Sequence, residues 1–107
     1  MLAARAADAK KGEDVVVLDV GEVLGIVGTF VIASASNARL VRAIVEEVET
    51  WLREQLGIQP RSVEGLSDAS WVLLDFGDVI VHLFTADKRE YYRLEELWGR
   101  TSPVVRF

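Results

Sequence analysis

The alternation of apolar and polar residues is clearest between Trp71 and Phe84, where the chain reads WVLLDFGDVIVHLF. Side chains along a strand point to alternate faces, and Gly77-Asp78 suits a two-residue primed turn. The pattern predicts a β-hairpin in which Phe76 pairs with Val79. One face of this hairpin is apolar: Val72, Leu74, Phe76, Val79, Val81 and Leu83. The other face, called the mixed face below, carries Trp71, Leu73, Asp75, Ile80, His82 and Phe84.

The two faces of the hairpin are expected to lie in different surroundings. The apolar face is expected to lie in the core. The mixed face suits either a core or an interaction surface, because Trp71 and Phe84 pair across the strands beside His82. Aromatic side chains fill cores, but in an exposed patch they are typical interface anchors. The residue pattern alone leaves both interpretations open.

The most regular helical pattern lies between Leu40 and Leu56, where apolar residues recur at spacings of three and four. This spacing predicts an amphipathic helix. Ser34 to Asn37 hold several N-cap candidates, and Gly57 suits the C-terminal end. The expected apolar stripe consists of Leu40, Val41, Ile44, Val45, Val48, Trp51, Leu52 and Leu56.

Shorter elements surround these two. The alanine-rich segment Leu2–Lys11 predicts a helix that ends at Gly12; its expected apolar stripe is Leu2, Ala6 and Ala9. Strands are expected at Val15–Val20, Thr29–Ala33 and, as a short edge strand, Arg61–Gly65. A last helix is expected to begin with a capping box of Asp87 and Glu90 and to continue through Tyr91, Leu94, Leu97 and Trp98. A loop at Gly21–Gly28 and an unassigned tail after Pro103 complete the chain.

This order of elements predicts an α/β (α+β) fold with a mixed sheet of about five strands packed by helices. The length of 107 residues favours a single domain spanning residues 1–107. The chain has no cysteine, which excludes disulfides, cysteine nucleophiles and cysteine-ligated metals. No apolar run approaches the ~20 residues of a membrane helix, and no signal-peptide pattern opens the chain. We therefore expect a cytoplasmic protein.

The net charge of -5 makes direct binding of nucleic acid unfavourable and suits a basic protein partner.

Metal-dependent nucleotidyl transfer would need grouped carboxylates, and Asp19, Asp75 and Asp78 are the candidates. Asp78 lies in the predicted turn and should point unlike Asp75. The only histidine is His82, and the spacing of Gly21, Gly25 and Gly28 matches no phosphate-binding motif. Catalysis, metals and cofactors therefore have little support.

Two runs of sequence carry a resemblance to a known family. The run from Glu64 to Phe84, EG-x6-WVLLDFGDVIVHLF, and the run from Arg89 to Trp98, REYY-x-LE-x-LW, closely resemble the ribosomal silencing factors, also called Iojap-related proteins. FVIASASNARLVRAI, from Phe30 to Ile44, resembles the second strand and central helix of that family. The family usually has an Asp and an aromatic residue where this chain has Gly28 and Thr29.

The resemblance implies a translational repressor that is not an enzyme. Such a protein binds the large ribosomal subunit through ribosomal protein L-fourteen and sterically blocks joining of the small subunit when nutrients are scarce. The resemblance also implies a nucleotidyltransferase-like fold without the catalytic acids, and self-association as a homodimer away from the ribosome.

Residue pattern and resemblance together predict a partner-binding surface on the mixed face. Its expected members, on or beside the surface, are Trp71, Phe76, Ile80, His82 and Phe84. Asp75 and Asp78 are expected to face basic groups of the partner, and Arg89 and Tyr92 to be rim contacts. The alternative function is a nucleotide-binding or nucleotidyltransferase-like domain, and a structural homodimer is a third possibility.

Overall fold

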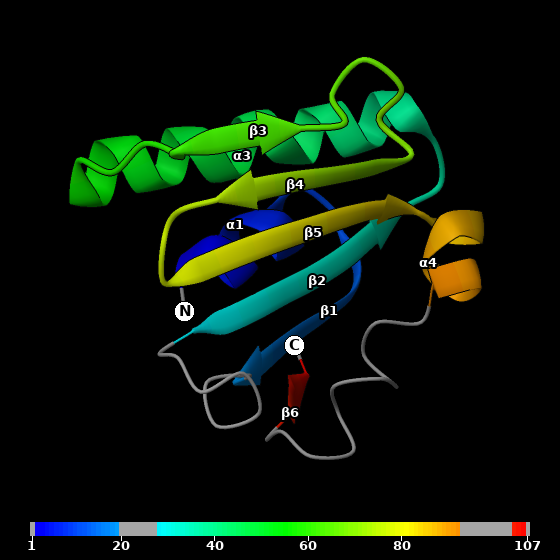
Figure 1. The fold of residues 1–107 in the computed structure, drawn as a ribbon, viewed down its shortest axis with the longest axis horizontal. Coiled ribbons are helices and arrows are strands. Elements are labelled where there is room, and N and C mark those ends of the chain that lie inside the picture. Colours follow the sequence, from blue (N-terminus) through cyan, green and yellow to red (C-terminus); the bar gives the residue numbers. More distant parts are fainter. Residues whose placement is uncertain (1, 20–27, 93–103, 107) are drawn as a thin grey trace.

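The computed structural model describes residues 2–19, 28–92 and 104–106, and the ribbon in Figure 1 shows their arrangement. The described helices are α1 (Leu2–Ala9), α3 (Ala38–Leu56) and α4 (Ala86–Tyr92). The described strands are β1 (Glu13–Asp19), β2 (Thr29–Ala35), β3 (Ser62–Glu64), β4 (Trp71–Asp75), β5 (Val79–Thr85) and β6 (Val104–Arg106).

These six strands form one mixed sheet in the order β3-β4-β5-β2-β1-β6. The β2–β5 pair is parallel, and the other neighbouring pairs are antiparallel. The predicted fold class is confirmed, with the tail adding β6 as a further strand beside β1. Among the described helices, none is long and apolar enough to cross a membrane.

Both α1 and α3 lie behind the sheet in Figure 1, so they cover one of its faces. The larger apolar cluster lies between these helices and the sheet, and it contains the hairpin residues Val72, Leu74, Val81 and Leu83. A smaller cluster of Val16, Leu18, Ile32 and Phe84 lies apart from it, with Phe30 and Trp71 packed against it. Strand β1 contributes to both clusters, as expected for a strand that is buried on both faces.

The predicted hairpin is confirmed in register and in turn length. Trp71 pairs with Phe84 and Asp75 pairs with Ile80. The Phe76 N–H donates to the Val79 carbonyl at 2.9 Å, which closes the two-residue turn. Gly77 has a φ of 95°, a value that glycine adopts without steric cost.

The central helix α3 also has the predicted ends. The Asn37 side chain accepts a hydrogen bond from the Leu40 N–H at 2.9 Å. At the other end, Gly57 adopts a left-handed φ of 68°, and its N–H donates to the Arg53 carbonyl at 3.0 Å, which is the αL pattern of helix termination. Most of the predicted stripe is buried or half-buried, but Leu40 and Leu56 are exposed.

Helix α1 differs from the prediction in detail. In α1, the buried residues are Ala3, Ala4, Ala6 and Ala7, while Ala9 is exposed. The left-handed residue after α1 is Lys11, whereas Gly12 is needed because a Cβ there would approach the Ala7 carbonyl oxygen. The left-handed residue that follows α1 is therefore one position before the glycine that was expected to end the helix.

Helix α4 begins at Ala86, so the predicted capping box starting at Asp87 is wrong by two positions. Thr85 directly precedes the helix, and Asp87 lies in its first turn. A hydrogen bond with the Thr85 side chain lowers the pKa of Asp87. The predicted loop at residues 21–27 and the helical stripe beyond Tyr92 lie outside the described residues.

Candidate functional site

Strand β2 widens the mixed face beyond the hairpin. In the parallel β2–β5 register, Phe30 pairs with Ile80, and Ile32 pairs with His82. Paired residues of neighbouring strands point to the same side of a sheet, so Phe30 and Ile32 join the mixed face. The alternation in TFVIASA predicts that Phe30 and Ile32 share a side, but only the sheet order shows which side. Phe30 is therefore a candidate site residue that sequence reasoning missed.

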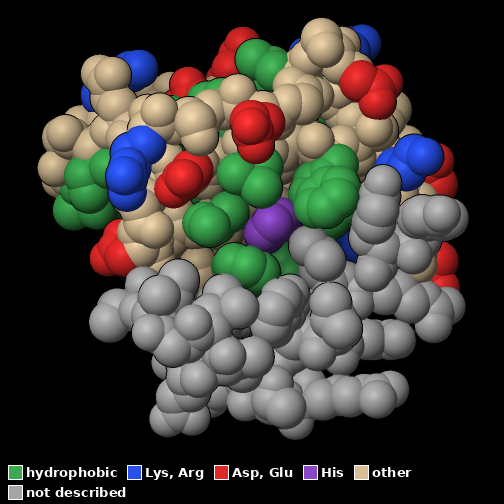
Figure 2. Space-filling model, in the orientation of Figure 1, with side chains coloured by type: hydrophobic (Ala, Val, Ile, Leu, Met, Phe, Trp, Pro, Cys, Tyr) green, Lys and Arg blue, Asp and Glu red, His purple; other side chains and the backbone are tan. Residues whose placement is uncertain are grey.

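Four rings meet at the centre of the mixed face. The Trp71 and Phe84 rings are stacked with centroids 5.0 Å apart, and the Phe30 and His82 rings meet edge-on at 4.6 Å. In the space-filling view of Figure 2, the single histidine lies among hydrophobic side chains. Phe84 is fully buried, whereas Trp71, Ile80 and Phe30 are half-buried. Phe84 thus lies beneath the surface and supports Trp71.

His82 is held in a neutral state by its surroundings. It is 5% exposed, and its Nδ1 accepts a hydrogen bond from the Trp71 Nε1–H at 3.2 Å. Burial lowers the pKa of His82 from 6.5 to about 4. At neutral pH the ring is uncharged, and its bond to the indole fixes the orientation of Trp71.

The loop that leads into Trp71 is fixed from two sides. Gly65 has a φ of 85°, and a Cβ at this position would overlap the Trp71 carbonyl oxygen. From α3, the Arg42 guanidinium donates to the Leu66 carbonyl at 3.2 Å and to the Ser67 carbonyl at 2.7 Å. These contacts give Gly65 an architectural role and hold the start of β4 in place.

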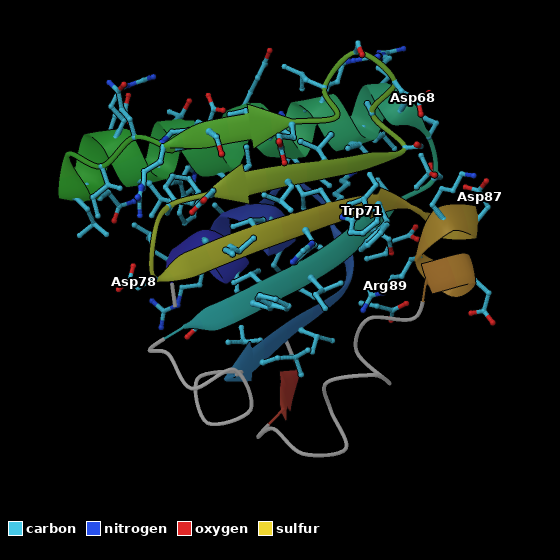
Figure 3. All side chains as sticks on the ribbon, viewed as in Figure 1. Asp68, Trp71, Asp78, Asp87 and Arg89 are labelled. Carbon is cyan, nitrogen blue, oxygen red and sulfur yellow. The ribbon has the colours of Figure 1, made fainter. Side chains whose placement is uncertain are left out.

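The candidate acids do not gather into a catalytic group. The Asp75 carboxylate accepts a hydrogen bond from the Gly77 N–H at 2.8 Å and so stabilises the turn. Asp78 is exposed at the hairpin end (Figure 3), and the Asp19 side chain lies outside the described residues. Within the described ranges, no three His, Asp or Glu residues are grouped so that they would hold a metal ion.

Phe76 and Asp78 belong to a different part of the surface from Trp71. The two-residue turn keeps Phe76 on the apolar face of the hairpin, where it packs against the larger cluster. With Asp78 it borders a pocket of about 230 Å³ that is also lined by Leu2, Ala3, Leu52, Leu56, Ile58 and Val79. The expectation that Phe76 lies beside the mixed face is therefore corrected.

Arg89 is not a rim residue. It is 7% exposed, and its Nη1 donates to the Glu13 carbonyl at 3.0 Å and to the Ser34 Oγ at 3.3 Å. These bonds join α4 to β1 and β2, so the role of Arg89 is to hold the helix. The Tyr92 side chain lies outside the described residues, and its predicted rim contact stays a prediction.

Comparison with known proteins gives a consistent result. The family model described as ribosomal silencing factor during starvation matches residues 1–106. The chain is 42% identical over 98 residues to a ribosomal silencing factor of Bacillus subtilis, covering 92% of this chain and 82% of that protein. It is 44% identical over 104 residues to one of Halalkalibacterium halodurans, covering 97% and 87%. A crystal structure from Chromobacterium violaceum has a TM-score of 0.85 at 35% identity, covering 92% of this chain and 81% of that one.

Proposed function

The chain belongs to the ribosomal silencing factor family, and from this premise we propose that it represses translation by binding the large ribosomal subunit. The contact is made with ribosomal protein L-fourteen, and the bound chain sterically blocks joining of the small subunit under nutrient limitation. The observation that carries this proposal is the mixed face, where aromatic side chains surround a neutral His82 on the side of the sheet away from α1 and α3.

The packing around Trp71 supports a role in binding. Its ring is stacked on the buried Phe84, and its indole N–H is bonded to His82. A large side chain that is already ordered loses little conformational entropy when a partner covers it. Half-buried aromatic anchors of this kind carry most of the binding energy in many interfaces.

Charge supports a basic protein partner. The chain carries a net charge of -5, and complementary fields increase the rate of association. Asp78 is exposed at the hairpin end, and Asp75, half-buried on the mixed face, lies at the same end. In this proposal they attract basic groups of the partner, while the aromatic centre of the mixed face supplies the affinity.

The proposed mechanism requires binding and no chemical step. A chain that occupies the joining face of the large subunit excludes the small subunit by competition, so repression depends on concentration and affinity. The candidate acids Asp75 and Asp78 take part in turn structure and surface charge in this account. No specific observation favours the nucleotidyltransferase alternative.

Self-association is part of the same proposal. A second copy that covers the mixed face would hide its aromatic side chains and would compete with the ribosome by mass action. Sedimentation velocity of the free chain should show a concentration-dependent dimer that dissociates when large subunits are added. A dimer that binds large subunits intact would contradict a shared surface.

The function is tested by mixing purified small and large subunits with increasing amounts of the chain and separating the products on sucrose gradients. We expect joined ribosomes to decrease and the chain to sediment with the large subunit. Undiminished joining at saturating chain concentration would contradict the proposal.

A further inference from the structure

The His82 imidazole uses one of its two nitrogens within the described structure. Nδ1 accepts from the Trp71 Nε1–H at 3.2 Å. Because an indole nitrogen can only donate, Nδ1 must be unprotonated. In a neutral imidazole the other nitrogen then carries the proton, so Nε2 is a hydrogen-bond donor.

This donor has no hydrogen-bond partner among the described residues, although its atom is buried. Buried polar groups in native proteins are nearly always paired, and an unpaired one is unfavourable. The position lies in the middle of β5, between β2 and β4, where an apolar residue would avoid this cost. The unpaired donor therefore calls for an explanation beyond packing.

The groups around the His82 ring determine which kind of acceptor can bond to the Nε2–H. The Phe30 ring lies 4.6 Å away, the Trp71 ring 6.0 Å and the Phe84 ring 6.4 Å. An acceptor that approaches here passes between apolar groups, which penalises a charged carboxylate more than an uncharged carbonyl. The negative net charge of the chain also disfavours a carboxylate.

We propose that the Nε2–H of His82 donates a hydrogen bond to a carbonyl oxygen of the protein partner that docks on the mixed face. This inference rests on the proposed function and adds the chemistry of its recognition: an apolar partner surface that presents one uncharged acceptor opposite His82. Docking opens access to the buried Nε2 and pairs the donor. A partner that lacks the acceptor would leave the donor unpaired and would be rejected.

The test uses three variants that separate the two nitrogens of His82. His82→Gln places an amide N–H near the Nε2 position but removes the acceptor for Trp71. His82→Asn keeps an acceptor near Nδ1 but lacks the distal donor, and His82→Phe lacks both. The affinity of each full-length variant for purified large ribosomal subunits is measured by quantitative pelleting, after urea unfolding has confirmed that each variant folds.

We expect His82→Gln to bind about tenfold or more tightly than His82→Asn and His82→Phe, the size of one hydrogen bond. The reverse order of Gln and Asn would show that His82 only positions Trp71 and would overturn the inference. Equal affinities for all variants would also overturn it.

Two further results distinguish a failure of this inference from a failure of the proposed function. If the wild type binds and all three variants bind equally well, only the inference fails; if the wild type does not bind, both fail. On the isolated chain, ¹⁵N NMR of the imidazole at neutral pH should show the Nε2–H tautomer. The Nδ1–H tautomer would overturn the inference whatever the result with ribosomes.

The acceptor class has its own test. Of the other mixed-face residues from β2 and β4, Asp75 is the one with a carboxyl group, and this group accepts a hydrogen bond from the Gly77 N–H. For an uncharged acceptor, the ratio of wild-type to His82→Gln affinity should stay constant between about pH 6 and pH 8. A ratio that rises toward acidic pH would indicate a carboxylate partner and overturn the carbonyl assignment.

Discussion

At the residue scale, His82 and Gly65 fix Trp71 from opposite ends. His82 accepts the indole N–H, and Gly65 allows the chain to pass against the Trp71 backbone. Neither residue needs to be exposed for this role, and His82 is almost fully buried. Substitution of either residue should therefore lower the free energy of unfolding and, through Trp71, weaken binding.

His82 should make stability fall at mildly acidic pH. The unfolded chain takes up this proton near pH 6.5, whereas the folded chain does so only near its pKa of about 4. Above pH 6.5 His82 is neutral in both states, and its burial does not reduce the free energy of unfolding. As the pH falls from 6.5 toward 4, the unfolded chain binds a proton that the folded chain does not, so the folded state loses stability. Between about pH 7.5 and pH 5, we expect a loss of about 2 kcal/mol in the free energy of unfolding relative to His82→Gln. Urea unfolding measures both chains, and equal pH slopes would contradict this account.

Gly65→Ala should destabilise the chain more than Gly57→Ala. Both glycines have positive φ, at 85° and 68°. A Cβ at Gly57 would meet nothing within 4 Å, while one at Gly65 would overlap the Trp71 carbonyl. We expect about 1–2 kcal/mol for Gly57→Ala from backbone strain alone and about 3 kcal/mol or more for Gly65→Ala. Urea unfolding of both variants checks the order, and equal losses would argue against the close approach.

At the scale of elements, Arg89 explains how α4 is held against the sheet. Its guanidinium bonds to the Glu13 carbonyl and the Ser34 Oγ, so it ties α4 to β1 and β2. The helix therefore depends on this side chain for its position at the end of β5.

Arg89→Ala should loosen α4 because the Glu13 carbonyl and the buried Ser34 hydroxyl lose the donor that ties them to this helix. We expect a loss of about 2–3 kcal/mol in the free energy of unfolding, as for hydrogen bonds made by a charged group. Hydrogen exchange of the α4 amides should become faster. Arg39→Ala, at an exposed position of α3, is the matched control and should change stability by less than about 0.5 kcal/mol. Equal exchange rates in α4 for both variants would contradict the anchoring role.

The elements that local sequence determines were predictable, and long-range pairings were not. The hairpin and α3 follow from alternation, a glycine turn and an Asn cap within a few residues of each other. The parallel β2–β5 pairing joins segments separated by α3, so no local pattern reveals that Phe30 lies beside His82. Arg89 was misplaced for the same reason, because its partners Glu13 and Ser34 are distant in sequence.

At the scale of the molecule, the sheet separates two surfaces. Helices α1 and α3 cover one face, and the pocket bordered by Phe76 and Leu56 belongs to that side. The mixed face lies on the other side, with Trp71 fixed at the pairing of β4 with β5 (Figure 3). This separation allows the binding surface to be tested with one substitution on each side.

The most direct test compares Trp71→Ala with Leu56→Ala in binding to purified large ribosomal subunits. Leu56 is 57% exposed and borders the pocket on the helix side, so its truncation is the matched control. We expect Trp71→Ala to weaken binding about 30-fold or more, as for an anchor worth about 2 kcal/mol, and Leu56→Ala to bind within about threefold of the wild type. Wild-type affinity for Trp71→Ala together with a large loss for Leu56→Ala would contradict the assignment of the mixed face as the ribosome-binding surface.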